Sequence, residues 1–203
     1  KDTLYAGAVF KDFDKVYYDR DSGSEQTSGT TGLSDRYSYT SAGLKLEYEN
    51  KTNPIQYGLR WLMEQRDYSD PVVVSQYDHD YQLIGGDVEL TLSKTTKLSF
   101  DASLYSRDYD ERPAHSTNGQ LLTANPALNY DYQALEITLR HQLREGWTGY
   151  IDYNHINRDD DYVGYNDYSS DAIKGRLIYK TKTIRSKLYI EYSTRDYPNA
   201  FAF

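Results

Sequence analysis

A long hairpin of alternating residues, from Gln82 to Tyr109, constrains the fold of this chain more than any other feature. Polar and apolar residues alternate along both arms, which is the pattern of strands with one apolar and one polar face. A tight turn at Lys94–Thr96 joins the arms. Each arm exceeds the roughly five or six residues of an average strand and approaches the length that a tilted strand needs to cross a bilayer. The apolar members are Ile84, Gly86, Val88, Leu90 and Leu92, then Leu98, Phe100, Ala102 and Leu104.

The composition excludes several classes of protein. No apolar run approaches the roughly 20 residues of a transmembrane helix, and the mean hydropathy is −0.84. A β-barrel is compatible with this polarity, because only every second residue of a strand faces lipid. The net charge of −8 argues against nucleic acid as a partner, and the absence of cysteine excludes disulfides and thiolate metal sites. The 203 residues predict a single all-β domain over 1–203, an antiparallel up-and-down transmembrane β-barrel or a segment of one.

Alternation along the rest of the chain predicts about nine strands. Short turns at 50–54, 94–96, 144–146 and 182–184 alternate with longer loops at 19–35, 69–76, 110–126 and 159–167. Tyr130 and Tyr132 have the opposite parity from the apolar Leu135, which suggests a β-bulge near Ala134. The expected strands cover residues 4–18, 37–49, 55–66, 82–93, 97–109, 130–143, 147–154, 173–180 and 188–195.

The alternation of short turns with long loops resembles that of Gram-negative outer-membrane β-barrel proteins, whose short turns are periplasmic and whose long loops are extracellular. Tyrosine-rich hairpins with a polar inner face are similar to those of porin-like barrels, polysaccharide exporters and cytochrome conduits. The resemblance implies location in the bacterial outer membrane, contact with membrane lipid and lipopolysaccharide, a role in transport, and a possible partner protein inside or completing the barrel. Tyr48, Tyr57 and Trp147 near the turns, and Trp61, Tyr153, Tyr179 and Tyr192 near the other edge, would form two aromatic girdles.

An Arg-Asp-Tyr repeat lies at the loop end of the strands that run from a short turn to a long loop. It occurs at Arg66, Arg107 and Arg195, with a looser version at Arg158. Because lipid-facing positions exclude these arginines, parity points them into the barrel and the following aspartates outward. Arginine supplies fork-shaped donors and tyrosine a flat apolar face with a hydroxyl, so this rim is either packed structure or a site for an anionic or carbohydrate ligand. The candidate residues at the mouth are Arg66, Arg107, Arg158, Arg195, Tyr68, Tyr109, Tyr197, Tyr39 and Tyr81.

No catalytic, metal-binding or cofactor motif stands out. The four histidines are scattered, and the acidic run Asp159–Asp161 lacks the later ligands of a calcium loop. We therefore expect no catalytic residues, no metal, no cofactor and no enzymatic activity. Outer-membrane enzymes can nevertheless hold a Ser-His pair in a barrel wall.

Three functional hypotheses remain open at this stage. The chain could form a pore or export conduit, a structural barrel that encloses a protein partner or plug, or a soluble secreted β-sandwich that binds carbohydrate. The ninth expected strand runs toward the loop side, so a closed barrel needs at least one more strand. We expect that strand from further sequence or from other chains.

Overall fold

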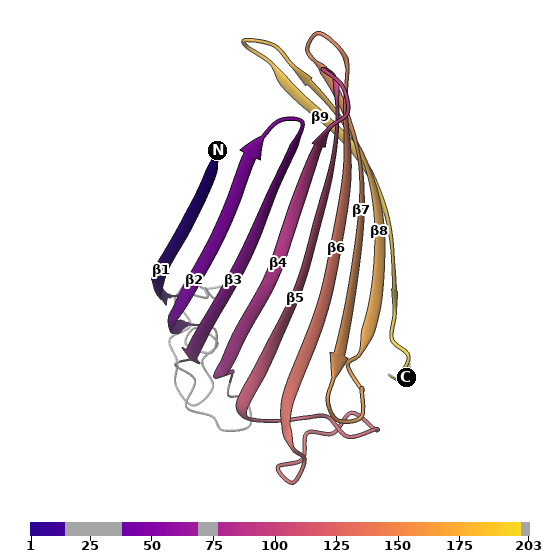
Figure 1. Ribbon diagram of the computed structural model, residues 1–203. Coiled ribbons are helices and arrows are strands. Elements are labelled where there is room, and N and C mark those ends of the chain that lie inside the picture. The colour runs from indigo at the N-terminus through magenta and orange to yellow at the C-terminus, as the bar shows by residue number, and fades with distance from the viewer. Residues whose placement is uncertain (15–37, 69–76, 200–203) are drawn as a thin grey trace, which may run out of the picture.

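One antiparallel sheet of nine strands makes up the described part of the chain in the computed structural model, which comprises residues 1–14, 38–68 and 77–199 (Figure 1). The strands neighbour one another in chain order, β1 to β9, as in an up-and-down barrel. The strands are β1 (Asp2–Phe13), β2 (Tyr39–Thr52), β3 (Ile55–Tyr68), β4 (His79–Thr91), β5 (Thr96–Pro113), β6 (Ala127–Arg144), β7 (Trp147–Asp160), β8 (Tyr168–Lys180) and β9 (Arg185–Asp196).

The number of strands and the places of the short turns confirm the sequence-based prediction. All short turns lie at one end of the sheet and the connections after β5 and β7 at the other (Figure 1). Several strands are longer than predicted, because β5 continues to Pro113 and β7 to Asp160. The predicted loops at 19–35 and 69–76, and the expected extension of the first strand beyond Asp14, lie outside the described residues.

The register confirms the predicted faces, because apolar residues of one parity pair with apolar residues of the next strand. One continuous row runs from Leu90 through Leu98, Leu139 and Ile151 to Gly175 and Ile190. This apolar face is uncovered, with Leu104 60% and Ile190 77% exposed. A face of this kind needs lipid or another apolar surface to cover it.

The expected β-bulge near Ala134 is wrong. The register runs without a break from Asp108 opposite Asn129 to Thr96 opposite His141, and Ala134 pairs regularly with Ser103. Tyr130 and Tyr132 simply lie on the polar face, where aromatic neighbours stabilise them without any change of register. The irregularities of β6 lie instead between Asp108 and Pro113 on its β5 side and between Gln142 and Arg144 on its β7 side.

The aromatic girdle near the short turns is confirmed with one correction. Tyr48 contacts Tyr57 with ring centroids 5.9 Å apart, and Trp147 contacts Tyr179 at 4.8 Å. Tyr179 was predicted at the opposite edge but pairs directly with Trp147, because β8 continues to its turn at Lys180.

The β-sandwich alternative is wrong for the described residues, since their strands form one sheet with no second sheet packed against it. Within the described residues, β1 pairs only with β2 and β9 only with β8, so this sheet is open. No helix in the described ranges is long and apolar enough to cross a membrane. The expectation that further strands complete the wall stays a prediction.

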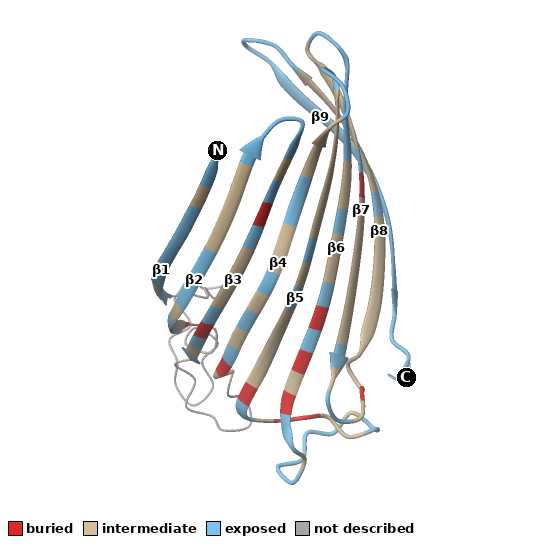
Figure 2. Cartoon of the chain, viewed as in Figure 1, coloured by how far each residue is buried: buried red, intermediate tan, exposed pale blue. Residues whose placement is uncertain are grey.

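Buried side chains concentrate at the loop end of the sheet. Figure 2 shows this concentration at the lower ends of β3 to β6. The buried cluster consists of Tyr109, Ala114, Leu128, Tyr130 and Tyr132, with Tyr77, Tyr105 and Ile156 packed against it. The best-packed part of the described molecule therefore coincides with the predicted mouth.

Candidate site: an arginine–tyrosine ring at the loop end

The four arginines of the repeat lie on the polar face and pack against tyrosine rings. We call Arg66, Arg107, Arg158, Arg195 and the aromatic residues around them the arginine–tyrosine ring. The guanidinium carbon of Arg66 lies 4.5 Å from the centre of the Tyr81 ring, and that of Arg107 lies 5.5 Å from Tyr132. Arg158 and Arg195 each lie 4.5 Å from the Tyr168 ring. These are cation–π distances.

The arginines occupy one height around the wall. Following the strand pairing from β3 across β4 to β5, Arg66 is level with Tyr109, which lies two residues beyond Arg107. In the same way, Arg107 on β5 is level with Asp160 on β7, which lies two residues beyond Arg158. Arg195 is shifted by two residues in the same way, because it pairs with Ser170 whereas Arg158 pairs with Tyr168. One residue of stagger per strand corresponds to a tilt of about 35°, which is the tilt of barrel strands. In a tilted wall the stagger keeps the arginines level.

The ring lies beyond the apolar band of the other face. The last apolar residues before it on that face include Met63 on β3, Leu104 on β5 and Tyr192 on β9. Polar residues follow on the outward face. The residues that come directly after the arginines on the outward face are Asp67, Asp108, Asp159 and Asp196. The loop ends of these strands therefore extend past the band that lipid would cover.

Aromatic side chains connect the ring from β2 to β6. Tyr39 contacts Tyr68, Tyr68 stacks on His79, and His79 contacts Tyr109, with centroid separations of 5.1, 5.8 and 5.1 Å. Farther along, Tyr109 meets Tyr130 edge-on, and Tyr105 stacks on Tyr132 at 4.4 Å. This continuous packing holds the guanidinium groups in place.

The arginines differ in how their charge is compensated. Arg66 donates to Glu64 at 2.9 Å, and the fully buried Glu64 side chain also binds Lys11 at 2.8 Å. Arg158 donates to the carbonyl oxygen of Asn166, and Arg195 to the Tyr197 hydroxyl at 3.4 Å. Among the described residues no carboxylate contacts Arg107.

Burial perturbs several titratable groups of the ring. It lowers the pKa of His79, which is 2% exposed and donates through Nδ1 to the carbonyl oxygen of Tyr77. Burial also raises the pKa of Tyr130 to about 12. Both groups are therefore neutral near pH 7, and the charge of the ring comes from its arginines.

All nine residues predicted at the mouth lie in this ring. Sequence reasoning did not include His79, Arg112, Tyr130 and Tyr132 among them. The signal for the two tyrosines was their parity, which the sequence analysis interpreted as a bulge. The positions of His79 and Arg112 gave no such signal, since burial at a strand end is not visible in an alternation pattern. Whether these residues bind a ligand stays a prediction.

A second ring of charges lies nearer the short turns on the same face. Arg60 forms a two-pronged ion pair with Asp101 at 2.7 Å, passing over Gly85. A side chain at position 85 would meet the guanidinium at 2.9–3.0 Å, so glycine makes this crossing possible. Arg176 pairs with Asp152 at 2.6 Å, and Lys174 with Glu191 at 2.6 Å. We call these residues the ion-pair ring.

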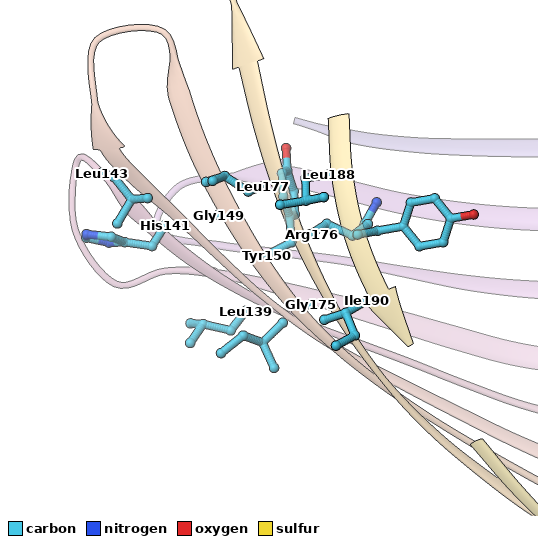
Figure 3. Close-up of a pocket in the computed structure, with 12 residues that line it drawn as sticks. Leu139, His141, Leu143, Gly149, Tyr150, Gly175, Arg176, Leu177, Leu188 and Ile190 are labelled. Carbon is cyan, nitrogen blue, oxygen red and sulfur yellow. The ribbon is translucent and has the colours of Figure 1, made fainter. Parts of the chain in front are cut away.

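A groove of about 680 Å³ opens on the apolar face between β6 and β9 (Figure 3). Two neighbouring rows of paired residues form its floor, and each row contains one glycine, Gly149 or Gly175. The missing side chains produce the hollow. His141 is a polar residue of the groove lining on this face, and its side chain is hydrogen-bonded to Thr96 at 2.9 Å. The lining offers no cluster of reactive groups, so the groove is not the candidate site.

The connections after β5 and β7 pack against each other beside the ring. His115 stacks on Tyr165 with centroids 5.5 Å apart, and the Asn166 side chain donates to His115 at 2.9 Å and to Tyr130 at 3.2 Å. Burial lowers the pKa of His115, and the nearby Arg112 and Arg158 act in the same direction. These contacts link the two connections to the buried cluster.

Comparison with known proteins supports the fold. No family model matches the chain, and no curated protein matches it. Its structure is similar to that of OmpTdeltaL8, a loop L8 deletion mutant of OmpT, an outer membrane protein of Vibrio cholerae, with a TM-score of 0.56 and 13% sequence identity. The match covers 81% of this chain and 51% of that protein, so the chain spans about half of its length. The described sheet has the fold of a β-barrel wall, similar to that of this outer membrane protein.

This likeness corrects the expectation that the chain is not an enzyme. That expectation rested only on the lack of a catalytic motif. The chain shares its fold with OmpT, and outer-membrane barrels include enzymes. Because one fold hosts many activities, the lack of a catalytic motif does not exclude enzymatic activity. The outward face does contain a histidine–carboxylate pair, in which His155 Nδ1 lies 2.9 Å from Asp171. No nucleophile is hydrogen-bonded to His155 among the described residues.

Proposed function

We propose that this chain forms part of the wall of a bacterial outer-membrane pore or export conduit whose extracellular mouth is the arginine–tyrosine ring. The observation that carries the proposal is the separation of the two faces. An apolar band that crosses every strand lies on the outward side, and the opposite face carries charged side chains from β1 to β9. Such a wall separates lipid from water.

The charges of the polar face support a hydrated interior. The ion-pair ring combines positive and negative groups at similar depth, which favours a wide, weakly selective passage. The arginine–tyrosine ring carries a positive excess at the loop end, so ions and solutes would pass a cationic rim. In this proposal the membrane is the bacterial outer membrane, and lipopolysaccharide surrounds the outward aspartates.

The test is conductance in planar lipid bilayers containing the purified protein. A pore gives stepwise currents, and changing Arg66, Arg107 and Arg195 together to Gln should shift the reversal potential in a salt gradient toward cation preference. Unfolded protein is excluded by checking the β-sheet circular dichroism of the variant. Absence of any current from correctly inserted protein would contradict the pore. A scaffold that encloses a partner protein would then be the better description.

A further inference from the structure

We propose that Arg107, Arg112, His79 and Tyr109 form a binding site for the carboxylate and a hydroxyl group of a sugar acid. The inference rests on the proposed function only in that it places this site at the mouth of the polar interior.

The first observation is a pair of arginines without carboxylate partners. Nε of Arg107 and Nη1 of Arg112 are buried and have no hydrogen-bond partner. No ion pair compensates either group among the described residues, whereas Arg66 has Glu64. Unsatisfied cationic donors are costly in a packed region, and an anion would satisfy them.

The second observation is an unused acceptor beside them. His79 is 2% exposed and its Nε2 has no partner. Since Nδ1 donates its proton to the Tyr77 carbonyl oxygen, the neutral ring leaves Nε2 as a hydrogen-bond acceptor. Burial lowers the pKa of His79 and so preserves this neutral form. An acceptor of this kind suits a ligand hydroxyl.

Tyr109 brings these groups together. It pairs directly with His79 across β4 and β5, with ring centroids 5.1 Å apart, and lies two residues from Arg107 on the same face. The Arg112 guanidinium lies 5.7 Å from its ring centre. The Tyr109 ring thus lies against His79 and the Arg112 guanidinium, with Arg107 two residues away on the same face. A carboxylate accepts from the arginines, a hydroxyl donates to His79, and the C–H face of a sugar ring packs on tyrosine.

The chemistry separates this site from a simple anion site. A bare anion would use the arginines and leave Nε2 of His79 without a donor. A neutral sugar would accept from the guanidinium groups through its hydroxyl oxygens but would leave both positive charges uncompensated. A sugar acid satisfies all three atoms.

The experiment uses the detergent-solubilised full chain, titrated with trigalacturonate by calorimetry. Its fully methyl-esterified form is the matched probe, since it has the same rings and hydroxyls without charge. We expect trigalacturonate to bind about 10- to 100-fold more tightly than the ester, and Arg107→Gln or Arg112→Gln to abolish the difference. Arg60→Gln, in the ion-pair ring, is the matched control and should leave it unchanged.

Two further arms keep the proposal falsifiable. Arg107→Lys keeps the charge but not the forked geometry, so it should restore part of the preference and report on any folding defect of Arg107→Gln. Inorganic phosphate should displace trigalacturonate only weakly. Equal binding of acid and ester, or full displacement by phosphate at matched charge, would overturn the assignment. Bilayer currents without this preference would overturn the binding site and leave the pore standing, whereas binding without currents would do the reverse.

Discussion

The two rings of the polar face surround most of their arginines with different partners. In the ion-pair ring, Arg60 and Arg176 meet carboxylates at 2.6–2.7 Å, so each positive charge is cancelled locally. In the arginine–tyrosine ring, Arg107, Arg158 and Arg195 meet tyrosine faces, which attract a cation without neutralising it. A chain with net charge −8 can therefore keep arginines without an ion-pair partner on its polar face, because partners rather than composition set the local field.

The largest effect is expected from a substitution that tests whether both rings lie on one face of the sheet while lipid covers the opposite face. Leu139→Arg, in the middle of the apolar face of β6, should cost roughly 2 to 4 kcal/mol of folding free energy in bilayers. Thr138→Arg is the matched control on the polar face of the same strand and should be tolerated. The measurement is the urea midpoint of folding into vesicles. An equal loss of folding free energy for both variants would contradict the assignment of one face to lipid and the other to the two rings.

A smaller effect is expected from removing one carboxylate of each ring, because the two carboxylates differ in burial. The Glu64 side chain is fully buried between Lys11 and Arg66, whereas that of Asp101 is 42% exposed. Glu64→Gln should cost roughly 1 to 3 kcal/mol, because it leaves two cations close together without their shared partner. Asp101→Asn should cost less than about 1 kcal/mol, since solvent screens that pair. Similar costs in parallel urea titrations would show that burial does not distinguish the rings.

The tyrosine faces of the arginine–tyrosine ring are tested by Tyr81→Leu, which keeps apolar bulk and removes the ring beneath Arg66. We expect a loss of about 0.5 to 1 kcal/mol, the size of a partly exposed cation–π contact. Lys45→Met, in the middle of β2, serves as a control for general effects of polar-face substitution. A double-mutant cycle with Arg66→Gln isolates the coupling. A coupling of zero would mean that the two side chains are only neighbours.

The smallest effect concerns pH and the packing of the connections beside the arginine–tyrosine ring. Burial lowers the pKa of His115, so the folded state disfavours the proton that the unfolded state accepts below about pH 6.5. The contribution of neutral His115 is therefore complete above that pH and declines as the pH falls below it. Asp160 opposes this effect, and Arg112 and Arg158 reinforce it.

Limited proteolysis within 114–126 measures that opening, and it should accelerate as the pH falls from 7 to 5. In His115→Asn the acceleration should disappear, because asparagine can still accept from Asn166 but does not titrate. An unchanged slope in the variant would assign the pH response to another group.

Most of the fold could be predicted from the sequence, because a barrel wall repeats one local rule. Alternation at Leu98, Phe100 and Leu104 fixes the face of each residue without any tertiary information. The arginine–tyrosine ring could be predicted in part, since Arg66 and Arg107 share a parity and a distance from their turns. The groups that complete the further site could not. His79 and Arg112 depend on side-chain packing between strands and on the irregularity between Asp108 and Pro113, which no periodicity encodes.

The two-residue shift of the arginines has a consequence for how such a wall could grow during evolution. In each strand that leaves a short turn, nearly the same number of residues separates the first residue of the strand from its arginine. Arg66 follows Ile55 by 11 residues, Arg107 follows Thr96 by 11, Arg158 follows Trp147 by 11 and Arg195 follows Arg185 by 10. Duplication of one whole hairpin would therefore add another arginine level with the others and widen the circumference without disturbing its neighbours. Insertion of a single residue below an arginine would instead turn that side chain to the opposite face. Hairpin-sized changes are thus the mutational steps that this architecture tolerates.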